Sequence, residues 1–274
     1  MAELDLAELT ATSLERIRER TPLVHNITNF VVMNDTANVL LAIGASPVMA
    51  HAIGEVREMV AHAGALVLNI GTLEDDWIES MLAAGAEANA RGVPIVLDPV
   101  GAGATTLRTS TSERILATVR VAVVRGNAGE LATVAGHPGQ VRGVDSVFAG
   151  SPEAAARAVA DRTGGAAVAS GAVDFVADAI RVAEIRNGDP LMGRITGSGC
   201  MATALVGAFL AVERDPFLAG VEAMIAFGIA GEVAARQSAG PGTFRANLID
   251  AVANLDRASI VAGARVTLRE SQRA

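Results

Sequence analysis

Residues 65–97 read ALVLNIGTLEDDWIESMLAAGAEANARGVPIVL, and this stretch decides the fold. Its two ends, 65–70 and 94–97, are short runs that are apolar on both faces, and 75–91 between them reads as a helix. Short strands that are apolar on both faces and separated by helices are typical of a parallel sheet covered on both sides. The stretch therefore predicts an α/β fold.

The same alternation continues on both sides of this unit. Further strands are predicted at 23–25, 46–49 and 121–124. Further helices are predicted at 4–20, at 30–43 (nearly all apolar and buried), at 55–62, at 127–135, and from a capping box at Ser110–Glu113 to about 120.

Beyond residue 165 the pattern changes. The strand-like runs are 166–169, 174–178 and 180–185, and the helical runs are 201–212, 216–237 and 242–256, followed by a polar tail. The short turns between these strands predict an antiparallel edge on the sheet. The chain contains no linker, repeat or low-complexity block, so we predict one α/β domain over 1–274, with peripheral tails at 1–13 and 261–274.

Composition excludes several classes of function. All 22 basic residues are arginine, whereas a Walker A loop, a pyridoxal-phosphate enzyme and a Schiff-base enzyme each need a lysine. The net charge is −8 with no dense basic run, which argues against a nucleic-acid or anionic-membrane partner. Any phosphate site must therefore use backbone N–H groups, arginine and metal.

The remaining composition points to a cytoplasmic protein. A single cysteine excludes an intrachain disulfide, and the four histidines lack close metal-ligand spacing. The acidic N-terminus lacks a signal-peptide pattern. Since no uninterrupted apolar stretch reaches the roughly 20 residues of a membrane span, we expect no membrane partner.

The segment Gly197-Ser-Gly-Cys200 lies where the apolar helix at 201–212 begins. Its two glycines let the backbone approach a ligand closely, and its N–H groups form an anion hole together with those of the first helical turn. The helix N-terminus favours the thiolate of Cys200. The combination suggests group transfer onto a small molecule. The alternative is a plain loop-to-helix junction with a buried cysteine.

Three polar clusters follow predicted strands at their carboxyl ends, where ligands of open α/β sheets bind. Asp98 is followed by a proline and two glycines. Arg125, Asn127 and Glu130 surround one strand-to-helix turn and could hold nucleotide phosphates and their metal. Alternatively, Asn127 caps the helix and Glu130 completes the cap. Ser170 ends a third strand, where a simple turn is also a sufficient explanation.

These clusters in this order resemble the ribokinase-like superfamily of small-molecule kinases. There, an N-x-x-E motif organises magnesium, and a C-terminal G-x-G-D motif forms the anion hole and supplies a base. In this chain Cys200 occupies the position of that aspartate. With this substitution, HNITNFVVMND at 25–35, LDPVGAG at 97–103 and RGN at 125–127 resemble the hydroxyethylthiazole kinase family of thiamine salvage. The resemblance covers about residues 14–260.

The resemblance implies a three-layer α/β/α sandwich with a mostly parallel central sheet. It implies that ATP, with Mg²⁺, phosphorylates the side-chain hydroxyl of 4-methyl-5-(2-hydroxyethyl)thiazole, and that the protein is a homotrimer with sites between subunits. The residue roles it implies are thiazole contacts at Asn26, Met49, Gly197 and Cys200, ATP contacts at Arg125, Asn127 and Ser170, magnesium organisers at Asp98 and Glu130, and an anion hole at Gly197, Gly199 and Cys200.

Two other functions are kept as alternatives. The nearer one is a ribokinase-like kinase for another vitamer alcohol, such as hydroxymethylpyrimidine or pyridoxal. The more distant one is a cysteine-nucleophile transferase or hydrolase, which needs a histidine base near Cys200, and none of the four histidines is adjacent in sequence. A non-catalytic binding protein is disfavoured by the coincidence of the motif clusters.

Overall fold

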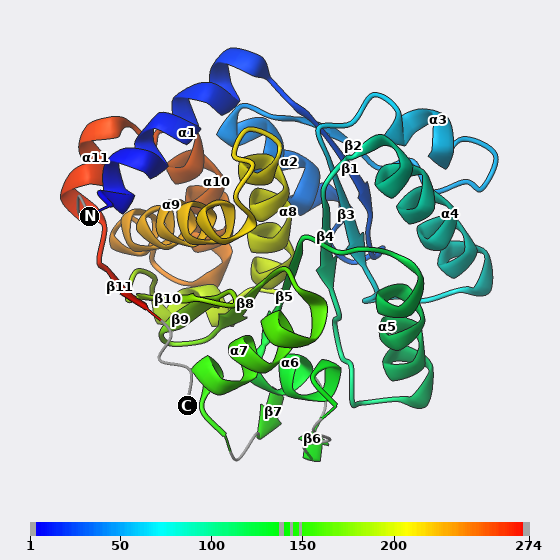
Figure 1. Ribbon diagram of the computed structural model, residues 1–274. Helices are drawn as coiled ribbons and strands as arrows, with labels where there is room; N and C mark the ends of the chain where they lie inside the picture. Colours follow the sequence, from blue (N-terminus) through cyan, green and yellow to red (C-terminus); the bar gives the residue numbers. More distant parts are fainter. Residues whose placement is uncertain (1–3, 137–139, 143–144, 148–149, 271–274) are drawn as a thin grey trace.

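The computed structural model describes residues 4–136, 140–142, 145–147 and 150–270. A nine-stranded sheet with the order β11-β10-β9-β8-β5-β4-β3-β1-β2 forms the centre of the molecule (Figure 1). Its strands are β1 (Leu23–Ile27), β2 (Ser46–Val48), β3 (Ala65–Asn69), β4 (Ile95–Asp98), β5 (Val123–Asn127), β8 (Ala166–Ser170), β9 (Asp174–Ala177), β10 (Arg181–Ile185) and β11 (Val266–Glu270). The pairing is parallel from β2 to β8 and antiparallel from β8 to β11.

The helices cover both faces of this sheet, which makes three layers (Figure 1). One face carries α1 (Leu6–Arg20), α2 (Met33–Ile43), α8 (Ser198–Leu210), α9 (Pro216–Arg236), α10 (Pro241–Ala253) and α11 (Arg257–Gly263). The other carries α3 (Val56–Val60), α4 (Asp75–Arg91), α5 (Thr106–Thr118), α6 (Ala128–Val134) and α7 (Pro152–Thr163). A short hairpin of β6 (Gln140–Arg142) and β7 (Asp145–Val147) and a 3₁₀ helix, η1 (Pro190–Arg194), complete the described elements.

Strand β3 explains why both faces need a helical layer. Its five residues are all buried, and its side chains alternate between the faces. Val67 packs in the core under α8 and α9, whereas Leu66 and Leu68 pack in the core under α4. The predicted mostly parallel α/β sheet with an antiparallel edge is therefore confirmed.

Several predicted boundaries were wrong. Helix α5 begins with Thr105 as its N-cap, so the predicted capping box at Ser110–Glu113 lies inside the helix. Helix α2 begins at Met33, and the apolar Phe30 and Val31 before it are exposed rather than buried. The predicted polar tail contains α11 and β11. Strand β11 was missed because an edge strand needs few apolar residues, and its own are only half-buried.

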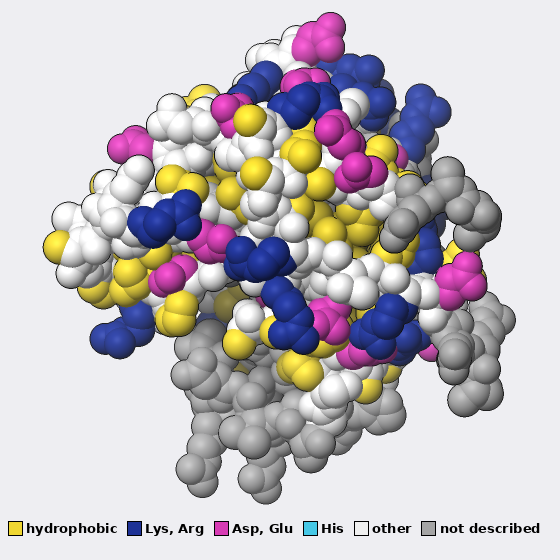
Figure 2. Space-filling model, turned by 90° about the vertical axis from the view of Figure 1, so that its left-hand side faces the viewer, with side chains coloured by type: hydrophobic (Ala, Val, Ile, Leu, Met, Phe, Trp, Pro, Cys, Tyr) yellow, Lys and Arg dark blue, Asp and Glu magenta, His cyan; other side chains and the backbone are white. Residues whose placement is uncertain are grey.

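Helix α9 is an apolar core helix. By length and composition it is the one described helix that could span a membrane, but 83% of its apolar window is buried inside the protein. At the surface, arginine and acidic side chains are interspersed on the face shown in Figure 2. Ion pairs among the described residues include Arg257 with Glu15 and Arg265 with Glu232.

Close packing of α8 on the sheet depends on Gly207. A Cβ atom at this position would lie 2.7 Å from Val67 Cγ2 and 3.2 Å from Val24 Cγ1. Because both contacts are to the buried faces of β1 and β3, neither neighbour can move easily.

We expect Gly207→Ala to lower the free energy of unfolding by about 1–3 kcal/mol through overpacking. Gly242→Ala on α10 is the control, because a Cβ there meets nothing within 4 Å. That substitution should be neutral or slightly stabilising. Urea unfolding of both variants measures the difference, and equal effects would contradict this account of the α8 packing.

Glu222 is a fully buried carboxyl in the middle of α9. Neither of its oxygens has a well-formed hydrogen bond to a residue within the described ranges. Burial raises its pKa to about 8, and the nearby Ser13 hydroxyl of α1 offsets this only in part. The native state therefore holds a proton that the unfolded state, with an ordinary value of 4.5, releases at lower pH.

Because the native pKa of Glu222 is raised, its contribution to stability is complete below about pH 4.5 and is lost as pH rises toward 8. Glu222→Gln should therefore gain stability relative to the unsubstituted chain as pH rises through this window. Urea titrations at several pH values measure the trend. Glu79→Gln, at an exposed ion pair, is the control and should not show this gain in stability with pH. If the free energy of unfolding of the Glu222 variant runs parallel to that of the unsubstituted chain over this pH range, the prediction is refuted.

Candidate active site

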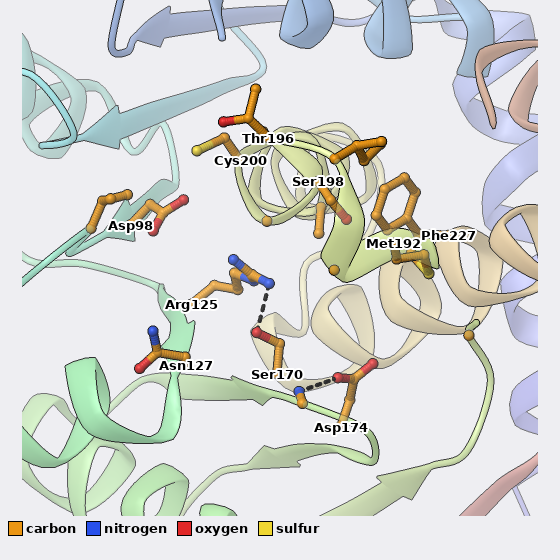
Figure 3. A pocket seen from close by; sticks show the side chains of 18 of the residues that line it. Asp98, Arg125, Asn127, Ser170, Asp174, Met192, Thr196, Ser198, Cys200 and Phe227 are labelled. Carbon is orange, nitrogen blue, oxygen red and sulfur yellow. Dashed lines mark hydrogen bonds between the residues drawn. The ribbon is translucent and has the colours of Figure 1, made fainter. Parts of the chain in front are cut away.

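A cavity of about 910 Å³ opens at the carboxyl ends of β4, β5 and β8, where the N-terminus of α8 meets the sheet (Figure 3). Most of the predicted site residues line it. These are Asp98, Arg125, Asn127, Glu130, Ser170, Gly197, Gly199 and Cys200. Residues from four separate segments of the sequence are thus brought to one place.

Gly197 leads the chain into α8 at the edge of the cavity. It is the N-cap of α8 with a φ of +83°, a conformation that favours glycine. A Cβ atom on it would lie 2.9 Å from Val32 Cγ1. The first helical hydrogen bond runs from Met201 N to Gly197 O, so the N–H groups of Ser198 to Cys200 have no partner inside the helix. Free N–H groups at a helix start can bind an anion, and the anion hole expected here stays a prediction.

Arg125 supplies a fixed positive charge next to this helix start. Its Nη2 donates to Ser170 Oγ at 2.6 Å, and a Cβ on Gly199 would lie 2.7 Å from its Nη1. It forms no ion pair with any residue that the structure describes. Asp174 holds the turn that follows Ser170, because its Oδ1 accepts a hydrogen bond from Gly171 N at 2.9 Å (Figure 3).

Arg108 is a second cation in the cavity lining that the sequence analysis missed. Its Nη1 donates to Val100 O at 2.9 Å and its Nη2 to Gly71 O at 2.6 Å. The residue lies in the first turn of α5, and the prediction that this helix starts later had placed it in a loop.

The capping alternative at Asn127 and Glu130 is confirmed. Asn127 Oδ1 accepts bonds from Gly129 N and Glu130 N, and Glu130 Oε2 accepts one from Asn127 N at 2.8 Å. Glu130 Oε1 also accepts a bond from Gly101 N at 2.8 Å, which ties the loop after β4 to α6. Burial and then the Asp98 carboxylate raise the pKa of Glu130 to about 7. The glutamate thus caps a helix while lining the cavity.

Asp98 is the last residue of β4 and is almost fully buried. Its Oδ2 accepts bonds from Asn69 Nδ2 at 2.8 Å and Thr203 Oγ1 at 2.7 Å. Burial raises the pKa of this carboxyl, and the Arg125 guanidinium is the largest opposing influence.

Cys200 lies in the first turn of α8, with its Sγ 3.2 Å from Asn69 Nδ2 and 3.6 Å from Asn29 Nδ2. Burial, followed by the charge of Asp98, raises the pKa of the thiol to about 12. The prediction that the helix N-terminus favours the thiolate was therefore wrong in direction, because burial outweighs the helix end.

Asn26 and Met49 do not line this cavity. Asn26 is buried, donates through Nδ2 to Val24 O, and has an Oδ1 without a hydrogen-bond partner among the described residues. The expected contacts of Asn26 and Met49 with the thiazole stay predictions.

The fold and the cavity fit the class expected from the sequence, a small-molecule phosphotransferase of the ribokinase-like type. An anion site at a helix N-terminus, a fixed arginine and two carboxylates face one cavity at the edge of a mostly parallel sheet.

Comparison with known proteins identifies the family. The sequence model of the hydroxyethylthiazole kinase family matches residues 14–258, and the chain belongs to that family. The hydroxyethylthiazole kinase of Desulforudis audaxviator is 54% identical over 257 residues, which are 93% of this chain and 94% of that protein.

Solved structures agree with this assignment. The hydroxyethylthiazole kinase structure from Pyrococcus horikoshii superposes with a TM-score of 0.88 at 44% identity, covering 97% of this chain and 100% of that one. A pyridoxal kinase from Staphylococcus aureus, solved with AMP-PCP and pyridoxal, has a TM-score of 0.64 at 15% identity and covers 91% and 99%. At this identity the likeness shows the shared fold alone.

The geometry around Cys200 predicts how substitutions there behave. We expect Cys200→Asp to keep substantial kinase activity, because a carboxylate accepts both a proton and the two amide N–H groups. Cys200→Ala should lose part of the activity, since the backbone anion hole survives. Steady-state assays of the two variants side by side measure this. Two folded but inactive variants would instead favour a covalent cysteine nucleophile.

Proposed function

We propose that this cavity transfers the γ-phosphoryl group of ATP to the side-chain hydroxyl of 4-methyl-5-(2-hydroxyethyl)thiazole, a reaction of thiamine salvage. Membership of the hydroxyethylthiazole kinase family supports the substrate. The observation that carries the chemistry is the meeting of the α8 N-terminus with the Arg125 guanidinium at one cavity.

Phosphoryl transfer needs alignment and charge stabilisation more than covalent chemistry. In this proposal the N–H groups from Ser198 to Cys200 bind the oxygens of the transferred phosphoryl, because they have no partner inside the helix and belong to the lining of the cavity. Arg125, held by Ser170, binds the ATP phosphates, and Asn127 lies beside it. Cys200 lies next to the attacking hydroxyl.

The carboxylates of Asp98 and Glu130 would hold Mg²⁺, which supplies charge neutralisation on the ATP oxygens when it is bound. No group of three or more potential ligands from His, Cys, Asp and Glu occurs among the described residues. Two carboxylates are nevertheless a fitting donor set, because Mg²⁺ commonly uses one or two together with phosphates and water. Their mutual charge also raises the pKa of Glu130, a cost that a divalent cation would offset.

We further propose a homotrimer, in which Asn26 and Met49 contribute to a site between subunits, and a cytoplasmic location. Support for these comes from the family resemblance and from the position of both residues outside the cavity of a single chain.

The cysteine-nucleophile alternative has little support from the geometry. The hydrogen-bond partners of Cys200 Sγ in the described chain are Asn69 and Asn29, and the described histidines, His25, His51 and His62, do not line the cavity. No described histidine is therefore placed to act as a general base for the thiol.

The deciding experiment is a steady-state assay of the purified chain with ATP and Mg²⁺ on three alcohols: the thiazole, hydroxymethylpyrimidine and pyridoxal. We expect the thiazole to have the highest kcat/KM and chelation of the metal to stop the reaction. Preference for either other alcohol would replace the proposed substrate, and transfer without metal would remove magnesium from the proposal.

For Arg125, we expect substitution by alanine to raise KM for ATP more than KM for the thiazole, because the guanidinium contacts phosphate and not the alcohol. Varying one substrate at a time separates the two constants. Arg114→Ala, at a surface ion pair with Glu79, is the control and should change neither. An equal effect of the Arg125 variant on both constants would argue against a nucleotide contact.

For Glu130, we expect Glu130→Gln to cut turnover heavily and to raise the magnesium concentration needed for half-maximal rate, since one charge at the metal is lost. The loss of one acceptor for Gly101 N or Asn127 N should cost about 1–3 kcal/mol of stability, so thermal unfolding is measured alongside. Normal turnover with a normal magnesium dependence would reduce Glu130 to its capping role.

A further inference from the structure

Asn69 is a buried amide at the carboxyl end of β3 that uses its full hydrogen-bonding capacity. Its Nδ2 donates to Asp98 Oδ2 at 2.8 Å and to Cys200 Sγ at 3.2 Å. Its Oδ1 accepts bonds from Asn29 Nδ2 at 2.8 Å and from Gly71 N at 3.0 Å. One side chain thus joins four segments of the chain at the cavity.

The orientation of this amide is fixed by the backbone. Gly71 N–H can only donate, so the Asn69 atom that faces it must be the oxygen. The same reasoning fixes Asn29, whose Oδ1 accepts a bond from Val31 N at 3.1 Å. Both amides therefore turn their NH₂ groups toward the sulfur of Cys200.

Two N–H donors at the sulfur determine how Cys200 can act. Because the sulfur accepts from Asn69 and Asn29, its own S–H bond has to point away from these two amides. Cys200 is part of the cavity lining, so the cavity is the space left for that bond. The register of the sheet supports this arrangement, since Asn69 pairs directly with Asp98 across β3 and β4.

We propose that Asn69 is a positioning residue, which holds the Cys200 side chain and directs it at the reacting hydroxyl of the substrate. This inference rests on the proposed function for its effect on catalysis, but the bond to the sulfur exists without substrate. Thr203 provides a matched control, because its Oγ1 bonds the same Asp98 oxygen.

The experiment is a double-mutant cycle. The two backgrounds are the unsubstituted chain and Cys200→Ala. In each background, kcat for the thiazole is measured with and without Asn69→Leu, and with and without Thr203→Val. If Asn69 acts through the sulfur, Asn69→Leu should lower kcat by a factor about tenfold larger in the cysteine background than in the alanine background. A coupling of this size is typical of directly bonded residues. Thr203→Val should cost the same factor in both.

A second readout needs no substrate. Cys200 is the single cysteine, so iodoacetamide alkylation of the ATP-free protein reports on it alone. Leucine fills the same space without donors, so Asn69→Leu should slow alkylation several-fold at one fixed alkaline pH, because the reacting thiolate loses its N–H partner. Thr203→Val should leave the rate unchanged.

Equal costs of Asn69→Leu in both backgrounds, unchanged or faster alkylation, or a coupling for Thr203→Val as large as that for Asn69→Leu would each overturn the proposal. If Asn69→Leu does not fold, Asn69→Ala takes its place in the cycle under the same criteria. A chain that fails to phosphorylate the thiazole but shows slowed alkylation in Asn69→Leu would contradict the proposed function and leave the positioning role intact.

Discussion

The first turn of α8 is held against the carboxyl edge of the sheet, and the chemistry of the cavity depends on this contact. Gly207 lets the helix lie directly on Val67 and Val24, and Gly197 turns the chain into the helix with a positive φ beside Val32. Gly199 then leaves room for the Arg125 guanidinium against the helix start. Three glycines in eleven residues thus set the distance between the N-terminus of α8 and the Arg125 guanidinium.

The second constraint is the burial of ionisable groups behind this helix start. Asp98, Glu130 and Cys200 all have raised pKa values, and burial is the largest cause in each case. Arg125 opposes all three shifts, and amide and backbone N–H groups meet the carboxylate and sulfur atoms. Further positive charge at this place would oppose the same shifts, which is consistent with the proposed magnesium site.

Much of the architecture could be predicted from the sequence, because short apolar runs separated by helices specify a parallel sheet. The rule that ligands bind beyond the carboxyl ends of strands placed Asp98, Arg125 and Ser170 together correctly. The same rule could have found Asn69, which ends β3 beside Asp98.

Other features could not be predicted because they depend on tertiary burial. The direction of the Cys200 pKa is decided by how deeply the thiol is covered, which the helix-terminus argument ignores. Arg108 reaches the cavity from a segment that carries no motif of its own. Strand β11 exists because β10 offers an unpaired edge, so its own sequence needed only two apolar residues.

The most direct measurement of the central claim is the single-turnover rate of phosphoryl transfer in Gly197→Ala compared with Gly92→Ala. Both glycines have positive φ, but Gly92 ends α4 and a Cβ there meets nothing within 4 Å. If the α8 N-terminus stabilises the transferred phosphoryl group, Gly197→Ala should slow transfer by about a hundredfold or more while Gly92→Ala stays near the unsubstituted rate. A folded Gly197→Ala variant that transfers phosphoryl as fast as the Gly92 variant would contradict the account.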